Sequence, residues 1–119
     1  MIQSGIVTIM VSDMSRSVNF YTKTLGLELK VQHDDEWAEV EAPGVRIGLH
    51  GGKKDSGSGG GANLSIGFQV ESIEDAMSTL TDRKVAFPRG ISDDGAVRLA
   101  FFSDPDDTAL YLCQEKKSS

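Results

Sequence analysis

The chain has 119 residues, of which 39% are hydrophobic, and its formal net charge is −6 at pH 7. This length and apolar content suit one ordinary hydrophobic core and exclude two independent domains. The acidic balance excludes nucleic acid and anionic membrane surfaces as favoured partners, because neither is attracted to a negative field.

The first half of the chain predicts a strand, a helix and three more strands. Apolar residues alternate with a period of two over 5–11, which is typical of a strand with one buried face. Val18, Tyr21 and Leu25 recur at helical spacing and predict a helix over 15–24, with Ser12 or Asp13 as its cap and Gly26 as its stop. Short polar or Pro-Gly turns then separate three predicted strands, at 27–31, 37–42 and 45–50.

The stretch 51–61 holds six glycines and almost no apolar side chain, so it has nothing to bury and much backbone entropy to lose. We predict that it is a flexible connector. A glycine-rich stretch can also cradle phosphate, but that use needs a helix directly after it, and here a strand is predicted to follow.

The second half repeats the first about 59 positions further on, since the run from Val7 to Asp13 has its counterpart in the run from Ile66 to Ser72. It predicts a strand at 64–70, a helix at 73–83 and strands at 85–87, 96–102 and 109–113. The expected fold class is therefore α+β, with two βαβββ modules in one domain over 1–119. The modules cover 1–50 and 62–115, and they form a curved mixed sheet with a concave cup for a ligand and helices on the outer face.

Cysteine content and hydropathy favour a cytoplasmic protein. Cys113 is the single cysteine, which excludes an internal disulfide and suits a reducing compartment. No apolar run approaches the ~20 residues of a membrane span, and the N-terminus lacks the basic and apolar regions of a signal peptide.

Two motifs carry a family resemblance. The run from Val11 to Tyr21, ending in Leu25-Gly26-Leu27, resembles the opening of the vicinal oxygen chelate superfamily, which contains glyoxalases, bleomycin-resistance proteins and extradiol dioxygenases. The run from Asp104 to Thr108, followed by Leu110-Tyr111-Leu112, resembles the closing signature Asp-Pro-Asp-Gly-Asn of that family. The resemblance implies the repeated fold, and it implies activity only weakly, because one scaffold carries many chemistries. It also implies a homodimer, since family members commonly complete their cups by pairing modules within or between chains.

The resemblance also implies where a divalent metal would bind. Metal-dependent members use histidine or glutamine on the first strand, glutamate on the fourth, histidine on the fifth and glutamate on the eighth. The matching positions here hold Ile6, Gly48, Ser65 and Tyr111. Isoleucine and glycine have no side-chain donor, serine is a poor one and tyrosine mainly binds ferric iron, so we expect no metal cofactor.

Three catalytic alternatives stay open. A divalent metal could be held by a shifted set, with His50 as its nitrogen ligand and Glu39 and Glu41 nearby. Glu39 or Glu41 could instead act as a general base together with Tyr111, although alternating glutamates also describe a half-exposed strand. Cys113 could be a nucleophile, but a buried structural thiol is the commoner role for a cysteine without a nearby histidine.

The predicted cup combines apolar and aromatic walls with a few polar tips, which is typical of a small-molecule site. Arg46, Arg98 and His50 at its rim would suit an anionic group, whereas Glu39 and Glu41 would suit a cationic one. We therefore expect a metal-free protein that binds a hydrophobic or aromatic drug or metabolite without transforming it, with a glyoxalase-like enzyme and an interaction module as alternatives. The expected ligand-binding residues are Ile6, Thr8, Met10, Trp37, Glu39, Glu41, Gly48, His50, Ser65, Gln69, Phe101, Phe102 and Tyr111.

Overall fold

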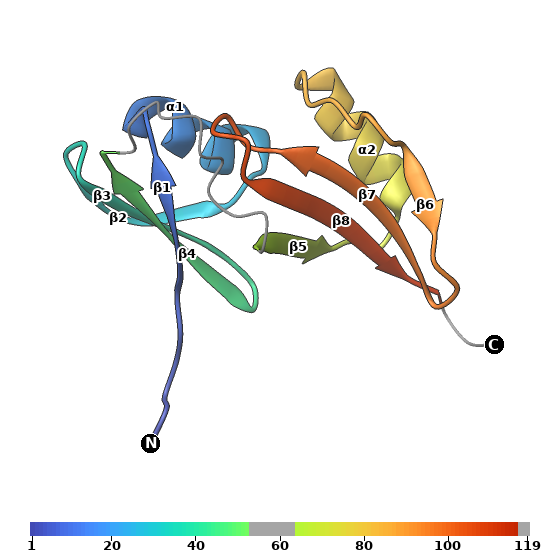
Figure 1. The fold of residues 1–119 in the computed structure, drawn as a ribbon, viewed down its shortest axis with the longest axis horizontal. Helices are drawn as coiled ribbons and strands as arrows, with labels where there is room; N and C mark the ends of the chain where they lie inside the picture. The colour runs from blue at the N-terminus through green and yellow to red at the C-terminus, as the bar shows by residue number, and fades with distance from the viewer. Residues whose placement is uncertain (53–63, 117–119) are drawn as a thin grey trace. The chain divides into compact units, whose positions relative to one another are not determined.

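The computed structural model describes residues 1–52 and 64–116, and the chain divides into two compact units, Met1–Ser58 and Gly59–Ser119. Both units have the same order of elements, a strand, a helical segment and three strands, which confirms the predicted βαβββ repeat (Figure 1). Most of the predicted connector 51–61 lies outside the described residues.

The first unit contains one four-stranded sheet with strand order β1-β4-β3-β2. β1 runs parallel to β4, and the other neighbours are antiparallel. The helix α1 contacts β3 and β4, so the core of this unit lies between the helix and one face of the sheet. The elements are β1 (Val7–Val11), α1 (Met14–Asn19), the π-helical turn η1 (Phe20–Thr24), β2 (Glu28–His33), β3 (Trp37–Ala42) and β4 (Val45–Gly51).

Both ends of the first helical segment match their sequence signals. The Asp13 carboxylate accepts a hydrogen bond from the Arg16 amide at 3.0 Å, which satisfies one of the free donors of the first turn. The segment closes as a π-helical turn, in which the Leu25 amide donates to the Phe20 carbonyl at 3.0 Å, and Gly26 follows with a φ of 79°. Its buried face carries Tyr21, which is 0% exposed.

The second unit repeats this plan with strand order β5-β8-β7-β6. β5 is parallel to β8, and α2 contacts β7 and β8. Ser72 caps α2, because its hydroxyl accepts a hydrogen bond from the Asp75 amide at 3.2 Å. The elements are β5 (Ser65–Gln69), α2 (Ile73–Asp82), β6 (Ile91–Asp93), β7 (Val97–Ser103) and β8 (Ala109–Glu115).

The predicted strand at 85–87 is wrong. These residues form an irregular segment, and the edge strand β6 begins only at Ile91. The Val85 amide donates to the Leu80 carbonyl at 3.0 Å at the end of the helix, and Pro88 has no amide hydrogen to offer a sheet. The side chains of Val85 and Phe87 pack into the core instead, since Val85 is buried and the Phe87 ring lies 5.3 Å from that of Phe102.

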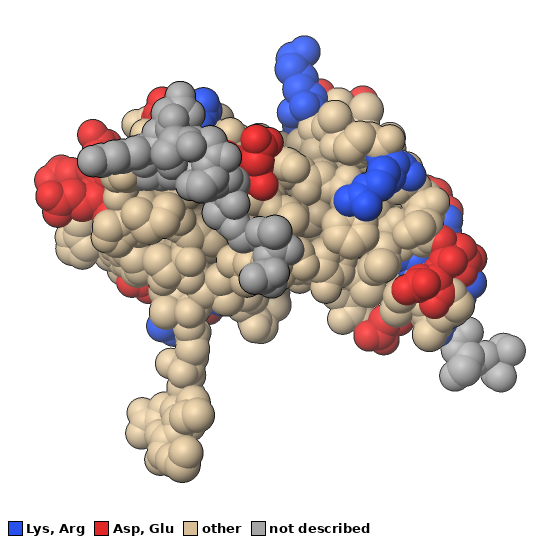
Figure 2. All heavy atoms as spheres, in the orientation of Figure 1, with Lys and Arg blue, Asp and Glu red and all other residues tan. Residues whose placement is uncertain are grey.

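Polar contacts tie α2 to its sheet. The Gln114 side chain in β8 accepts a hydrogen bond from the Ile73 amide at 2.7 Å, and Arg98 in β7 pairs with Glu74 at 2.5 Å. The Arg98 guanidinium lowers the pKa of Glu74 through this hydrogen bond. Lys116 and Asp93 form a second ion pair at 2.5 Å, and acidic and basic side chains lie together where β6 and β8 end and β7 begins (Figure 2).

The loop between β7 and β8 is built around a buried carboxylate. Asp104 is 4% exposed, and its side chain accepts hydrogen bonds from the Asp106 amide at 2.9 Å and the Thr108 amide at 2.8 Å. Asp107 has a φ of 66°, a conformation that glycine adopts more easily. Asp107 stands where the closing signature that this loop resembles has glycine, the residue that adopts this conformation at the lowest cost.

Candidate functional site

Each sheet has one face that its own helix does not cover, and we call it the helix-free face. In the first unit the cross-strand partners Met10, His50 and Trp37 form one row of this face, and Thr8, Gly48 and Glu39 form the next. Their neighbours Ile9, Val40 and Leu49 are buried on the opposite face, toward the helix. The burial pattern therefore places these two rows on the face that points away from the helix.

The side chain of Trp37 lies across Gly48 on the helix-free face of the first unit. A Cβ atom at position 48 would overlap the six-membered ring of the indole, so only glycine leaves room for the ring. The indole Nε1 donates to a carboxylate oxygen of Glu39 at 3.0 Å, which holds the ring in this position. The His50 ring lies 6.2 Å from the indole in an edge-on arrangement, and its Nδ1 is 2.8 Å from the Gly51 carbonyl oxygen.

The second unit has the same arrangement with different residues. Gly67, Tyr111 and Phe101 are cross-strand partners in one row of its helix-free face. The Tyr111 ring lies across Gly67, where a Cβ atom would overlap it. The rings of Phe101 and Tyr111 are 5.3 Å apart and tilted by 40°, and the Arg89 guanidinium carbon lies 4.9 Å above the Phe101 ring.

A half-buried aromatic ring laid over a glycine therefore occurs on both helix-free faces. Without the glycine, each ring would have to stand away from the sheet. With it, the ring lies low and offers a flat apolar surface on which a planar molecule can stack. Polar tips lie beside both rings, namely the Glu39 carboxylate in the first unit and the Tyr111 hydroxyl in the second. This combination is typical of small-molecule sites.

The predicted ligand-binding residues fall into two groups. Twelve of the thirteen lie on or next to a helix-free face, although Ile6 precedes β1 and is 41% exposed. Phe102 does not, because it is 3% exposed and packs against Phe87 under α2. Arg98, expected at the rim, is also on the helix side, where it pairs with Glu74.

The four positions at which the resemblance implies metal ligands do not fit a divalent ion. Ile6 and Gly48 supply no side-chain donor, and the Trp37 indole occupies the space above Gly48. Ser65 and Tyr111 lie in neighbouring rows of the second unit, and the Tyr111 ring is turned over Gly67. No three His, Cys, Asp or Glu side chains come close enough together within residues 1–52 and 64–116 to hold a metal ion.

The shifted set also lacks a metal-binding arrangement. The Glu39 carboxylate accepts the indole hydrogen bond of Trp37, and the Nδ1 atom of His50 is in contact with a backbone carbonyl. Cys113 is half-buried on the helix-free face of the second unit, opposite Leu99 and Gln69. A cysteine nucleophile needs a base or a positive charge beside its sulfur, and neither neighbour supplies one.

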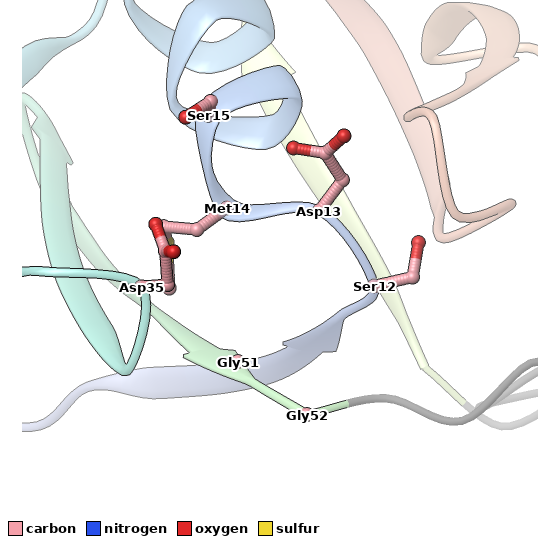
Figure 3. A pocket seen from close by; sticks show the side chains of 7 residues that line it. All are labelled: Ser12, Asp13, Met14, Ser15, Asp35, Gly51 and Gly52. Atoms are coloured by element: carbon pink, nitrogen blue, oxygen red, sulfur yellow. The ribbon is translucent and has the colours of Figure 1, made fainter.

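A separate polar hollow of about 320 Å³ lies at the start of α1 (Figure 3). The turn between β2 and β3 borders it on one side, where the Asp35 carbonyl oxygen lies so close to Gly51 that a Cβ atom there would overlap it. Asp13 in this hollow is engaged as the helix cap, and the Arg16 guanidinium donates to the Ser12 hydroxyl at 2.9 Å. The residues around it are Ser12, Asp13, Met14, Ser15, Asp35, Gly51 and Gly52.

Two βαβββ units, each with a four-stranded mixed sheet and a helical segment on one face, have the architecture of vicinal oxygen chelate folds. A family model described as the Glyoxalase/Bleomycin resistance protein/Dioxygenase superfamily matches residues 3–111, and the chain belongs to this family. A search of curated proteins found no match.

Solved structures show the same fold at low sequence identity. One is a glyoxalase/bleomycin resistance protein/dioxygenase from Alicyclobacillus acidocaldarius, with a TM-score of 0.78 and 15% identity over 97% of this chain and 92% of that one. Another is the corresponding domain from Frankia sp. EAN1pec, with a TM-score of 0.76 and 22% identity over 100% and 96% of the two chains. A third is TnmS3, an antibiotic binding protein from Streptomyces sp. CB03234, with a TM-score of 0.72 and 25% identity over 98% and 99%.

Arg89 is a site residue that the sequence prediction missed. It lies between Pro88 and Gly90 in the segment after α2, and no periodic pattern assigns such a residue to a face of the sheet.

None of the helices in the described part of the chain is long and apolar enough to cross a membrane.

Proposed function

We propose that this protein binds a hydrophobic or aromatic small molecule on its helix-free faces without a metal and without transforming it. The observation that carries the proposal is the aromatic ring laid over a glycine in each unit, Trp37 over Gly48 and Tyr111 over Gly67. Flat, half-exposed rings with few polar neighbours suit stacking of a planar ligand.

Two further observations support binding over catalysis. The family's four metal positions hold residues that do not form a divalent site, so the chemistry of its metal-dependent members has no support here. TnmS3, whose name describes it as an antibiotic binding protein, is similar to this chain over nearly its whole length. We extend antibiotic or metabolite binding to this chain on that similarity.

A ligand screen tests the proposal. Purified protein is heated with a library of aromatic antibiotics and metabolites, and a ligand at 100 times its dissociation constant stabilises the native state by ~2.7 kcal/mol. We expect hits from planar aromatic compounds, quenching of Trp37 fluorescence, and a smaller thermal shift in Trp37→Leu and Tyr111→Leu. Chromatography after overnight incubation should return each hit unchanged. An unresponsive library would support the interaction module, and a converted hit would support an enzyme.

Metal analysis tests the alternative of a glyoxalase-like enzyme with a relocated ion. After incubation with Ni, Zn, Mn or Fe(II) and dialysis, we expect well under one ion per chain. A stoichiometric ion lost in His50→Ala would support the enzyme and overturn metal-free binding.

The homodimer and the cytoplasmic location stay predictions, and light scattering of the purified protein tests the homodimer.

A further inference from the structure

We propose that the helix-free face of the second unit selects aromatic ligands that carry a carboxylate, with Arg89 as the residue that binds this group. The inference rests on the proposed function, because it names the class of ligand for the same site. It also decides a question that the sequence leaves open, namely whether the site favours an anionic or a cationic group.

Geometry places Arg89 where it can reach a stacked ligand. Its guanidinium carbon is 4.9 Å above the Phe101 ring, and that ring is 5.3 Å from the ring of Tyr111. A turn fixes the backbone on both sides, since Pro88 has a restricted φ and the Gly90 amide donates to the Phe87 carbonyl at 3.0 Å. A planar ligand resting on Tyr111 would therefore have the guanidinium at its edge.

The charge of Arg89 is available for a ligand. Within residues 1–52 and 64–116 no carboxylate forms an ion pair with it, whereas Arg98 pairs with Glu74 and Lys116 pairs with Asp93. The Glu115 carboxylate belongs to the same face of β8 but lies four residues from Tyr111, roughly 13 Å along the strand. No acidic residue occurs in the rows of Phe101 and Ser103 on this face.

The chemistry of the guanidinium favours an anionic group with two adjacent oxygens, such as a carboxylate, over a neutral group. A guanidinium stacked on an aromatic ring keeps its N–H edges free, and these edges match the two oxygens of a carboxylate. The net charge of −6 opposes any anion at long range. Salt screens that repulsion beyond about 8 Å at physiological ionic strength, while the direct contact persists.

Binding of a matched pair of probes tests the inference. 1-Naphthoate and 1-naphthamide share a ring system and differ in charge, and their dissociation constants are measured by calorimetry or by NMR titration. We expect the wild-type protein to bind the naphthoate about tenfold more tightly, as one charged hydrogen-bonded contact allows. In Arg89→Gln the ratio of the two constants should fall to within about twofold, and Arg89→Lys should keep part of the preference. Arg98→Gln is the matched control, since it removes an arginine from the opposite face and should keep the full preference.

The outcomes separate the two proposals. Equal affinity for both probes, or a preference that survives in Arg89→Gln, overturns the role of Arg89 and leaves small-molecule binding intact. Binding of neither probe, and of no other aromatic compound in the screen, overturns both. Loss of the preference in Arg98→Gln as well as in Arg89→Gln would assign it to general surface charge and also contradict the inference.

Discussion

Replacing Gly67 by alanine should destabilise the protein, although alanine normally improves a strand. Gly67 has no positive φ, so its backbone accepts a side chain, and the lower entropy of the unfolded chain alone would favour alanine by about 0.5 to 1 kcal/mol. The added Cβ, however, would overlap the ring of Tyr111. Moving the ring breaks its contact with Phe101, which lowers the free energy of unfolding by about 0.5 to 1.5 kcal/mol. The strained rotamer of Tyr111 lowers it by a similar amount.

A double-mutant cycle isolates this effect. In Tyr111→Ala the overlap is gone, so Gly67→Ala should be neutral or stabilising there, and the coupling between the two positions should be about 1 to 3 kcal/mol. Urea unfolding of the four proteins measures it. Gly5→Ala is the control, because nothing lies within 4 Å of a Cβ at that position and its effect should stay within about 0.5 kcal/mol. Equal effects of Gly67→Ala in both backgrounds would refute the contact between ring and glycine.

Predictions for three other positions follow from particular structural features. Ser17 is 0% exposed and its hydroxyl has no hydrogen-bond partner among the described residues, so Ser17→Ala should stabilise the protein by about 1 kcal/mol in thermal unfolding, and destabilisation would reveal a partner. Asp107 has a φ of 66°, so Asp107→Gly should raise the midpoint of urea unfolding while Asp107→Val lowers it, and a lower midpoint for glycine would contradict the strain. The hydrogen bond from Arg98 lowers the pKa of Glu74 in the folded state. The stabilisation by this hydrogen bond is therefore complete when the pH is above 4.5, the ordinary pKa of Glu74, and it is lost as the pH falls below that value. Acid titration of Arg98→Gln should therefore show a shallower loss of stability below that pH, and an unchanged slope would exclude the pair.

Local signals predicted much of the fold. The period of two in β1 and β5 placed Thr8 and Gln69 on the helix-free faces, and the caps Asp13 and Ser72 marked where the helices begin. These features depend on residues close together in the chain. The segment 85–87 has the apolar composition of a strand, but its position between a helix end and Pro88 directs it to the core.

The contacts that define the site were harder to predict, because they join residues far apart in the chain. Consecutive residues of a strand point to opposite faces, so only one of Phe101 and Phe102 can face the ligand, and the cross-strand register with Tyr111 identifies Phe101. Sequence does reveal that Gly48 and Gly67 lie in strands, where glycine is unfavourable. Only the register shows that each makes room for an aromatic ring.

Calorimetric titration of the tightest aromatic ligand from the screen, before and after treatment with EDTA, tests metal-free stacking most directly. Binding through Trp37 and Tyr111 predicts the same dissociation constant in both titrations, with full recovery of the unmodified ligand. An affinity lost with EDTA and restored by a divalent ion would contradict it.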